Sequence, residues 1–123
     1  MLIVAGVLVG ALGIAHSVLG ERHIIGWLLR HELPVIAGST TFAARTIRFA
    51  WHVTSVLFLG LGVVLVLIAV QASEQLVLTA LGSSLIASGL LPLWFTRGRH
   101  LSWIVLLAAG ALCLLSATGQ WWA

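Results

Sequence analysis

The chain has 123 residues, of which 61% are hydrophobic and 7% charged, and its formal net charge at pH 7 is +3. A soluble domain is about 45–50% apolar and about 25% charged, so this chain lacks the polar side chains needed to cover a surface in water. The composition excludes a soluble globule, a disordered chain and a basic nucleic-acid-binding face, and the single cysteine, Cys113, excludes an internal disulfide.

Four apolar stretches follow one another along the chain, and each is long enough to cross a bilayer. About 17–25 apolar residues span the hydrocarbon as a helix, and the predicted spans are residues 2–19, 42–70, 76–95 and 101–120. Backbone in lipid must satisfy its hydrogen bonds within the segment, so we expect helices. The sequence predicts an all-α integral membrane protein whose single domain, residues 1–123, is a four-transmembrane-helix up-down bundle.

The connection between the first two spans is longer than a tight turn. Between Glu21 and Gly38 apolar residues are mixed with charged ones, and Pro34 stops any helix there. This pattern predicts a short interfacial segment that lies in the headgroup plane between helices 1 and 2. The Gly38-Ser-Thr-Thr41 sequence after it supplies a hydroxyl that can cap the second helix.

All six arginines fall on one side of the predicted bundle, whereas the other side carries one charged side chain, Glu74. The positive-inside rule makes the arginine-rich loops cytoplasmic and places both termini outside. Tryptophans are expected to form a belt at each membrane surface: Trp27, Trp51, Trp94 and Trp103 on the arginine side, and Trp121 and Trp122 on the other. We expect a multi-pass protein of a bacterial inner membrane, embedded in the lipid bilayer.

The five histidines also lie on the arginine side. In the second span, Arg45, Arg48 and His52 recur at steps of three and four residues, which places them on one stripe of a helix together with Thr41 and Ser55. Ionisable groups inside a bilayer are costly and usually face the bundle interior with a partner or a task. This stripe is therefore predicted to face the first span.

In the first span, His16 has Gly13 and Gly20 on its face. At 1.5 Å per residue, His16 lies about 6 Å inside Gly20, and His52 lies about 6 Å inside Arg48. Two imidazoles at similar depth on antiparallel helices are expected to face each other. The two glycines would leave room for a facing backbone or a flat ligand.

The first functional hypothesis is a b-type haem that serves electron transfer. Facing imidazoles can supply both axial nitrogens, and arginines at the membrane surface can pair with the propionates. In this hypothesis His16 and His52 bind the iron, and Arg45 and Arg48 neutralise the anionic groups. Glu21 is expected to pair with one of these arginines and to orient it.

A bare metal ion is the alternative occupant of the same place. His16, His52 and His23, with Glu21 as an oxygen donor, offer nitrogen and oxygen ligands suited to zinc, iron or copper. Glu21 is five residues from His16, about 140° round an ideal helix, so both reach one ion only if the helix ends near Gly20.

Hypotheses without a cofactor stay open. The histidines of the spans could hydrogen-bond hydroxyls such as Ser17, Thr54 or Ser55. Small residues in Gly6-x-x-x-Gly10 and Ser83–Ser88 let helices approach closely. They favour an accessory or oligomerising subunit without its own chemistry, in a homo-oligomer or a larger membrane complex.

In size and span count the chain resembles the small multidrug resistance exporters, which are dimeric transporters. The mechanism of that family depends on a glutamate deep in the first helix. Here Leu2–Ala15 contains no ionisable side chain. The sequence therefore disfavours a transporter of that kind.

Overall fold

The computed structural model describes residues 1–119, and within them the chain is almost entirely helical and forms no β-strand. The all-α prediction is confirmed. The elements in chain order are α1 (Leu2–Leu19), the π-helix η1 (Gly20–Ile25), α2 (Gly26–Leu28), α3 (Thr40–Ala69), α4 (Glu74–Thr96) and α5 (Ser102–Ala117). Gln120 of the predicted fourth span and the predicted belt residues Trp121 and Trp122 lie outside the described residues.

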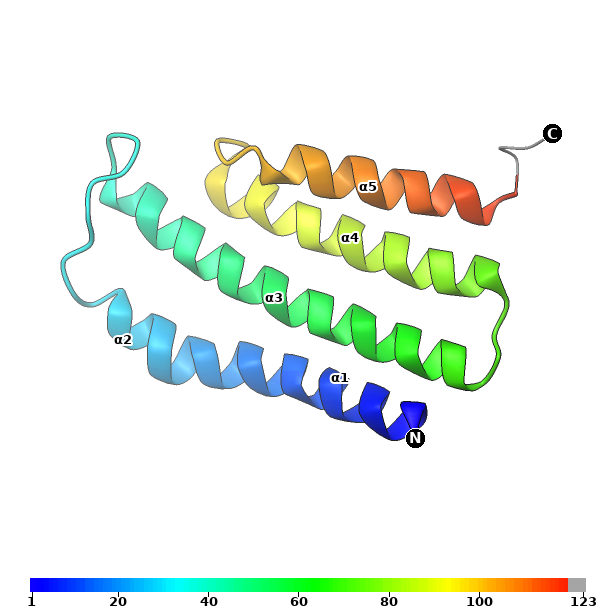
Figure 1. Ribbon diagram of the computed structural model, residues 1–123. Helices are drawn as coiled ribbons and strands as arrows, with labels where there is room; N and C mark the ends of the chain where they lie inside the picture. The colour runs from blue at the N-terminus through cyan, green and yellow to red at the C-terminus, as the bar shows by residue number, and fades with distance from the viewer. Residues whose placement is uncertain (120–123) are drawn as a thin grey trace.

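The helices lie side by side in one row in chain order, each antiparallel to the one before (Figure 1). α3 packs against α1 on one side and against α4 on the other, while α5 packs against α4 alone. Among the described residues α1 and α5 do not meet, so the helices form an open layer where the sequence predicted a bundle. The buried hydrophobic core is correspondingly small, consisting of Ile25, Ala43, Phe49 and Val64.

Three helices are long and apolar enough to cross a membrane. They are the continuous helix Leu2–Leu28, with 27 residues, α3, with 30, and α4, with 23. α5 has 16 residues, a length of about 24 Å, which is less than the ~30 Å of a hydrocarbon core. A membrane protein with three helices of spanning length is therefore supported, and the fourth predicted span is shorter than expected.

The helix that begins with α1 does not end near Gly20. It widens into η1 and continues through α2, so the predicted interfacial segment extends the first helix to Leu28 and the loop begins after it. η1 packs on α3, and its Ile25 is fully buried. This packing places Glu21 and its neighbours against α3.

The start of α3 is as predicted. Ser39 is the N-cap, and its side-chain oxygen accepts hydrogen bonds from the backbone N–H groups of Thr41, at 3.1 Å, and Phe42, at 3.4 Å. Pro34 lies in the preceding loop, outside any helix. We call the end of the row that carries η1, α2 and this loop the arginine end.

Glycines bring the backbones of neighbouring helices together. A Cβ added to Gly62 of α3 would lie 2.7 Å from the carbonyl oxygen of Gly6 in α1. Between α4 and α5, a Cβ added to Gly82 would lie 2.9 Å from the carbonyl oxygen of Gly110. In the Gly6-x-x-x-Gly10 sequence, Gly6 therefore packs against α3 of the same chain.

Candidate functional site

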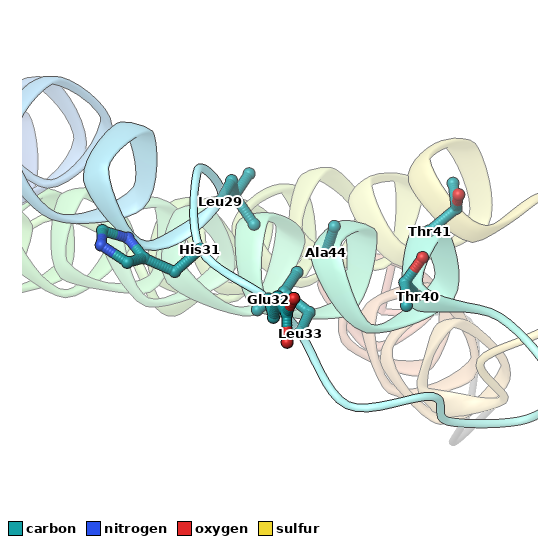
Figure 2. Close-up of a pocket in the computed structure, with 7 residues that line it drawn as sticks. All are labelled: Leu29, His31, Glu32, Leu33, Thr40, Thr41 and Ala44. Atoms are coloured by element: carbon teal, nitrogen blue, oxygen red, sulfur yellow. The ribbon is translucent and has the colours of Figure 1, made fainter.

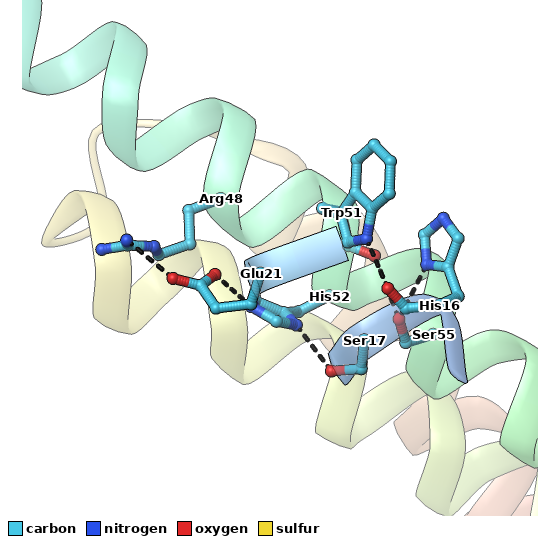
Figure 3. Close-up of polar contacts among 7 residues, drawn as sticks. All are labelled: His16, Ser17, Glu21, Arg48, Trp51, His52 and Ser55. Atoms are coloured by element: carbon cyan, nitrogen blue, oxygen red, sulfur yellow. Dashed lines mark hydrogen bonds and ion pairs between the residues drawn. The ribbon is translucent and has the colours of Figure 1, made fainter. Parts of the chain in front are cut away.

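Near the arginine end, seven side chains of the first helix and α3 are joined by polar contacts (Figure 3). We call these seven side chains the polar cluster. They are His16, Ser17, Glu21, Arg48, Trp51, His52 and Ser55. α1 and η1 supply the first three, and α3 supplies the other four. The cluster contains both histidines predicted for the spans, and it joins two helices that are antiparallel neighbours.

Glu21 is the anionic centre of the cluster. Its Oε1 lies 2.8 Å from Nη2 of Arg48, and its Oε2 lies 3.2 Å from Nε2 of His52. The pairing of Glu21 with one arginine of α3 is confirmed. Because an ionised carboxylate only accepts hydrogen bonds, Nε2 of His52 carries a proton in this arrangement.

The other ring nitrogen of His52 is also engaged. Its Nδ1 lies 2.9 Å from the hydroxyl oxygen of Ser17, one turn before Glu21 on the first helix. Both nitrogens of His52 thus bond to the first helix. Neither can bind iron or another metal unless one of these two contacts breaks.

His16 is held by two residues of α3. Its Nδ1 lies 2.9 Å from the hydroxyl oxygen of Ser55, and that hydroxyl donates to the backbone carbonyl of Trp51 at 3.4 Å. A hydroxyl has one proton to donate, so Ser55 accepts from an Nδ1–H of His16. Nε2 of His16 has no hydrogen bond within the described residues.

Trp51 covers one face of the His16 ring. The two rings are stacked with centroids 4.4 Å apart and an interplanar angle of 8°. The indole Nε1 also donates to the carbonyl oxygen of His16 at 2.8 Å. The sequence assigned Trp51 to an interfacial belt, whereas the structure places it in the polar cluster.

His16 and His52 do not form the facing pair that the haem hypothesis requires. Each imidazole bonds to a serine of the opposite helix, and the two rings point to different parts of the cluster (Figure 3). The predicted space for a flat ligand is filled, since a Cβ on Gly13 would lie 2.8 Å from the Ser55 carbonyl oxygen and a Cβ on Gly20 would overlap the Trp51 indole. As arranged here, the pair does not fit a haem between the two rings.

The four predicted metal ligands are not brought together as a set. Within residues 1–119 no three His, Cys, Asp or Glu side chains are placed to hold one ion. His23 is exposed, and its Nδ1 bonds the carbonyl oxygen of Leu19 at 3.2 Å. The helix continues past Gly20, and Glu21 bonds His52 of α3 and makes no hydrogen bond to His16 within the described residues.

Arg45 does not join Arg48 in the cluster. It lines a cavity with Trp94, Phe95 and Arg97 of the α4 end. α3 lies between α1 and α4, and residues three apart point about 60° away from each other on a helix. Arg48 therefore faces the first helix, whereas Arg45 lies on the side of α3 that faces α4.

The remaining histidines lie outside the cluster. Figure 2 shows a cavity of about 460 Å³ between the loop and the start of α3, lined by Leu29, His31, Glu32, Leu33, Thr40, Thr41 and Ala44. The His31 ring lies apart from the two threonines, and its Nδ1 bonds the Trp27 carbonyl oxygen at 3.0 Å. His100 bonds the Ser102 hydroxyl at 2.9 Å and packs edge-on against Phe49. Neither histidine gathers further ligating groups.

Ser17, His52 and Glu21 form a hydroxyl–imidazole–carboxylate chain, the order found in activated serine nucleophiles. Such catalysis also needs N–H donors aimed at the oxyanion. Ser17 lies inside the continuous helix Leu2–Leu28, where backbone N–H groups are used along the helix. These three side chains can pass a proton from one to the next, but Ser17 lacks free backbone N–H groups that could bind an oxyanion.

Alanine at position 20 is expected to open the polar cluster. The added Cβ would overlap the Trp51 indole, so the indole must leave His16 and its hydrogen bond to the His16 carbonyl is lost. We expect Gly20→Ala to lower the free energy of unfolding by about 1–3 kcal/mol, the usual effect of overpacking. Reversible unfolding in mixed micelles measures it, and an unchanged free energy would show that the indole lies elsewhere.

Comparison of the chain with protein-family models, with curated proteins and with solved structures gives no match.

Proposed function

We propose that the protein is an oligomerising membrane subunit without chemistry of its own, and that a second copy packs against α4. The observation that carries the proposal is a stripe of small side chains on the exposed face of α4. Thr79, Ser83 and Ala87 follow one another at intervals of four residues, and all three are exposed. Leu76 and Leu90, exposed to 54% and 51%, continue this face on either side.

Small residues at this spacing let two transmembrane helices approach closely, and hydroxyls among them can hydrogen-bond across the contact. Other small residues of the chain already face a neighbour. Gly6 meets Gly62, and a Cβ on Gly60 would lie 2.5 Å from the Ser84 side chain. The Thr79–Ala87 stripe has no such neighbour within the described residues.

Ser83 at the centre of the stripe supports the choice of a second copy. Thr79 donates to the Gln75 carbonyl oxygen at 2.7 Å, whereas the Ser83 hydroxyl makes no hydrogen bond within residues 1–119. A two-fold contact brings the same residue of both copies to the axis. A hydroxyl both donates and accepts, so two copies of Ser83 can satisfy each other.

The polar cluster contributes by holding the first helix on α3. Apolar burial does not press helices together in lipid, because lipid tails are as apolar as leucine. The ion pair and the hydrogen bonds of the cluster supply attraction that the apolar residues lack. The cluster occupies the α1–α3 contact and leaves the Thr79–Ala87 stripe of α4 uncovered.

Cysteine cross-linking in membranes tests the proposal. In a Cys113→Ser background, Ser83→Cys is expected to give an oxidised dimer, since a disulfide forms only when two Cα atoms come within about 7 Å. Leu12→Cys is the matched control, because Leu12 is 51% exposed on α1 and lies outside the stripe. Equal cross-linking of the two variants, or none in either, would overturn the proposal.

Haem b or a metal ion remains a second candidate because of one observation, the free Nε2 of His16. The ring is oriented through Nδ1, as ligating histidines commonly are. His16 would be one axial ligand for electron transfer, and the other would come from outside the pair with His52. Absorption spectra of oxidised and reduced protein, with metal analysis, test this candidate. A Soret band lost in His16→Ala and kept in His100→Ala would support it, whereas protein without colour or metal would refute it.

A further inference from the structure

A cavity of about 390 Å³ lies between α3 and the end of α4, away from the polar cluster. Arg45 lines it from α3, and Trp94, Phe95 and Arg97 line it from α4. Arg97 is the C-cap residue, with a left-handed backbone at φ 53°, which ends α4 at this position. Two arginines, one in α3 and one at the C-cap of α4, thus line one cavity at the arginine end.

These two guanidinium groups lack partners in the chain. Within residues 1–119 neither makes an ion pair, and no hydrogen bond involves either side chain. By contrast, Arg48 pairs with Glu21, and Arg99 donates to the Ala37 carbonyl oxygen at 3.0 Å. The cavity therefore carries positive charge that an anion would complement.

An apolar cavity of about 520 Å³ adjoins the first one. It is lined by Leu90, Leu91, Leu93, Trp94 and Arg97, so the two cavities share the walls made by Trp94 and Arg97. Trp94 is 83% exposed, which suits an indole at a membrane surface. The charged space and the apolar space thus adjoin each other at Trp94 and Arg97.

We infer that this pair of cavities binds an anionic phospholipid. The phosphate lies between Arg45 and Arg97, and an acyl chain lies along the leucines of α4. Arginine matches phosphate oxygens with a planar, bidentate fork. The adjoining apolar space distinguishes a lipid from free phosphate, which would use only the charged space. Leu90 borders both this apolar space and the face proposed for the dimer, but the inference does not rest on the dimer, because Arg45, Trp94 and Arg97 lie outside the Thr79–Ala87 stripe.

Native mass spectrometry of the full chain, released from micelles that contain phosphatidylglycerol and phosphatidylcholine, tests the inference. We expect retention of phosphatidylglycerol in preference to phosphatidylcholine. Arg45→Gln and Arg97→Gln should each weaken that retention by about tenfold, the loss of one charge-assisted contact. Arg22→Gln removes the same charge from an exposed position outside both cavities and should leave retention unchanged.

Three outcomes would overturn the inference. Equal loss in Arg22→Gln would mean attraction to surface charge in general. Equal retention of both lipids, each of which carries a phosphate, would mean that the cavities do not select an anionic phospholipid. Inorganic phosphate that displaces the lipid completely, together with full retention in Trp94→Ala, would assign the charged cavity to free phosphate. Unchanged helical circular dichroism of the two glutamine variants separates lost binding from lost folding.

Discussion

Replacing Gly62 with alanine is expected to separate α1 from α3 and to lower the free energy of unfolding by about 2–3 kcal/mol, the upper part of the range for overpacking. The added Cβ would lie 2.7 Å from the Gly6 carbonyl oxygen and 2.9 Å from the Gly10 backbone nitrogen. Both contacts are with helix backbone, which cannot move aside as a side chain can. The two helix backbones must therefore move apart at this crossing.

Gly10→Ala is the matched control for Gly62→Ala. Gly10 lies in the same α1–α3 contact, yet a Cβ added there meets nothing within 4 Å. Alanine is also the better helix former by about 1 kcal/mol, so this variant is expected to be as stable as the parent or more stable. Reversible unfolding in mixed micelles measures both variants. Similar destabilisation by the two would contradict the packing described for Gly62.

Removing the charge of Glu21 is the second change with a large expected effect. In Glu21→Gln, Arg48 loses its ion pair and His52 loses a charged acceptor. Hydrogen bonds to charged groups contribute about 1.5–3 kcal/mol, but the Glu21 and Arg48 side chains are each 38% exposed, so water screens them. We therefore expect a loss of about 1–2 kcal/mol in the free energy of unfolding.

Glu32→Gln controls for the loss of one negative charge, because Glu32 is an exposed loop residue. It should change stability by less than about 0.5 kcal/mol, as surface substitutions do. A double-mutant cycle between Glu21→Gln and Arg48→Gln isolates their contact, with an expected coupling of about 1 kcal/mol. Additive effects of the two substitutions would mean that they do not interact.

Much of the local structure could be predicted from the sequence. Hydrophobic length located three helices of spanning length, and the hydroxyl of Ser39 marked the start of α3. The cost of ionisable groups in lipid identified the region of the polar cluster and the pairing of Glu21 with an arginine. These features depend on composition and on local spacing, and both can be read from a single sequence.

The arrangement of the helices could not be predicted in the same way. In lipid, a surface facing another helix and a surface facing acyl chains can be equally apolar, so hydropathy does not reveal which helices touch. An open row of helices and a closed bundle of helices therefore have the same hydropathy pattern along the sequence. The continuation of the first helix was also hidden, because the mixed residues after Gly20 resemble an interfacial segment, while the burial of Ile25 holds them in helix.

Helical periodicity identified the faces of His16 and His52, and the prediction that these histidines bond hydroxyls of Ser17 or Ser55 is confirmed, but the sequence did not assign one serine to each histidine. His16 bonds Ser55, and the next residue, Ser17, bonds His52. Adjacent residues of the first helix thus contact α3 residues that are three positions apart. Which pairs meet depends on the register between the two helices, which local spacing does not fix. The presence of Trp51 beside His16 depends on the same register, although the four-residue step from Trp51 to Ser55 was a signal that they share a face.

The protonation of His52 tests most directly whether the polar cluster joins the first helix to α3. Nitrogen NMR of protein labelled with ¹⁵N-histidine resolves each ring nitrogen and its attached proton. We predict a proton on Nε2 of His52, donated to Glu21, and a changed Nε2 signal in Glu21→Gln. An Nε2 without a proton, as in an imidazole that binds iron through that nitrogen, would contradict the account.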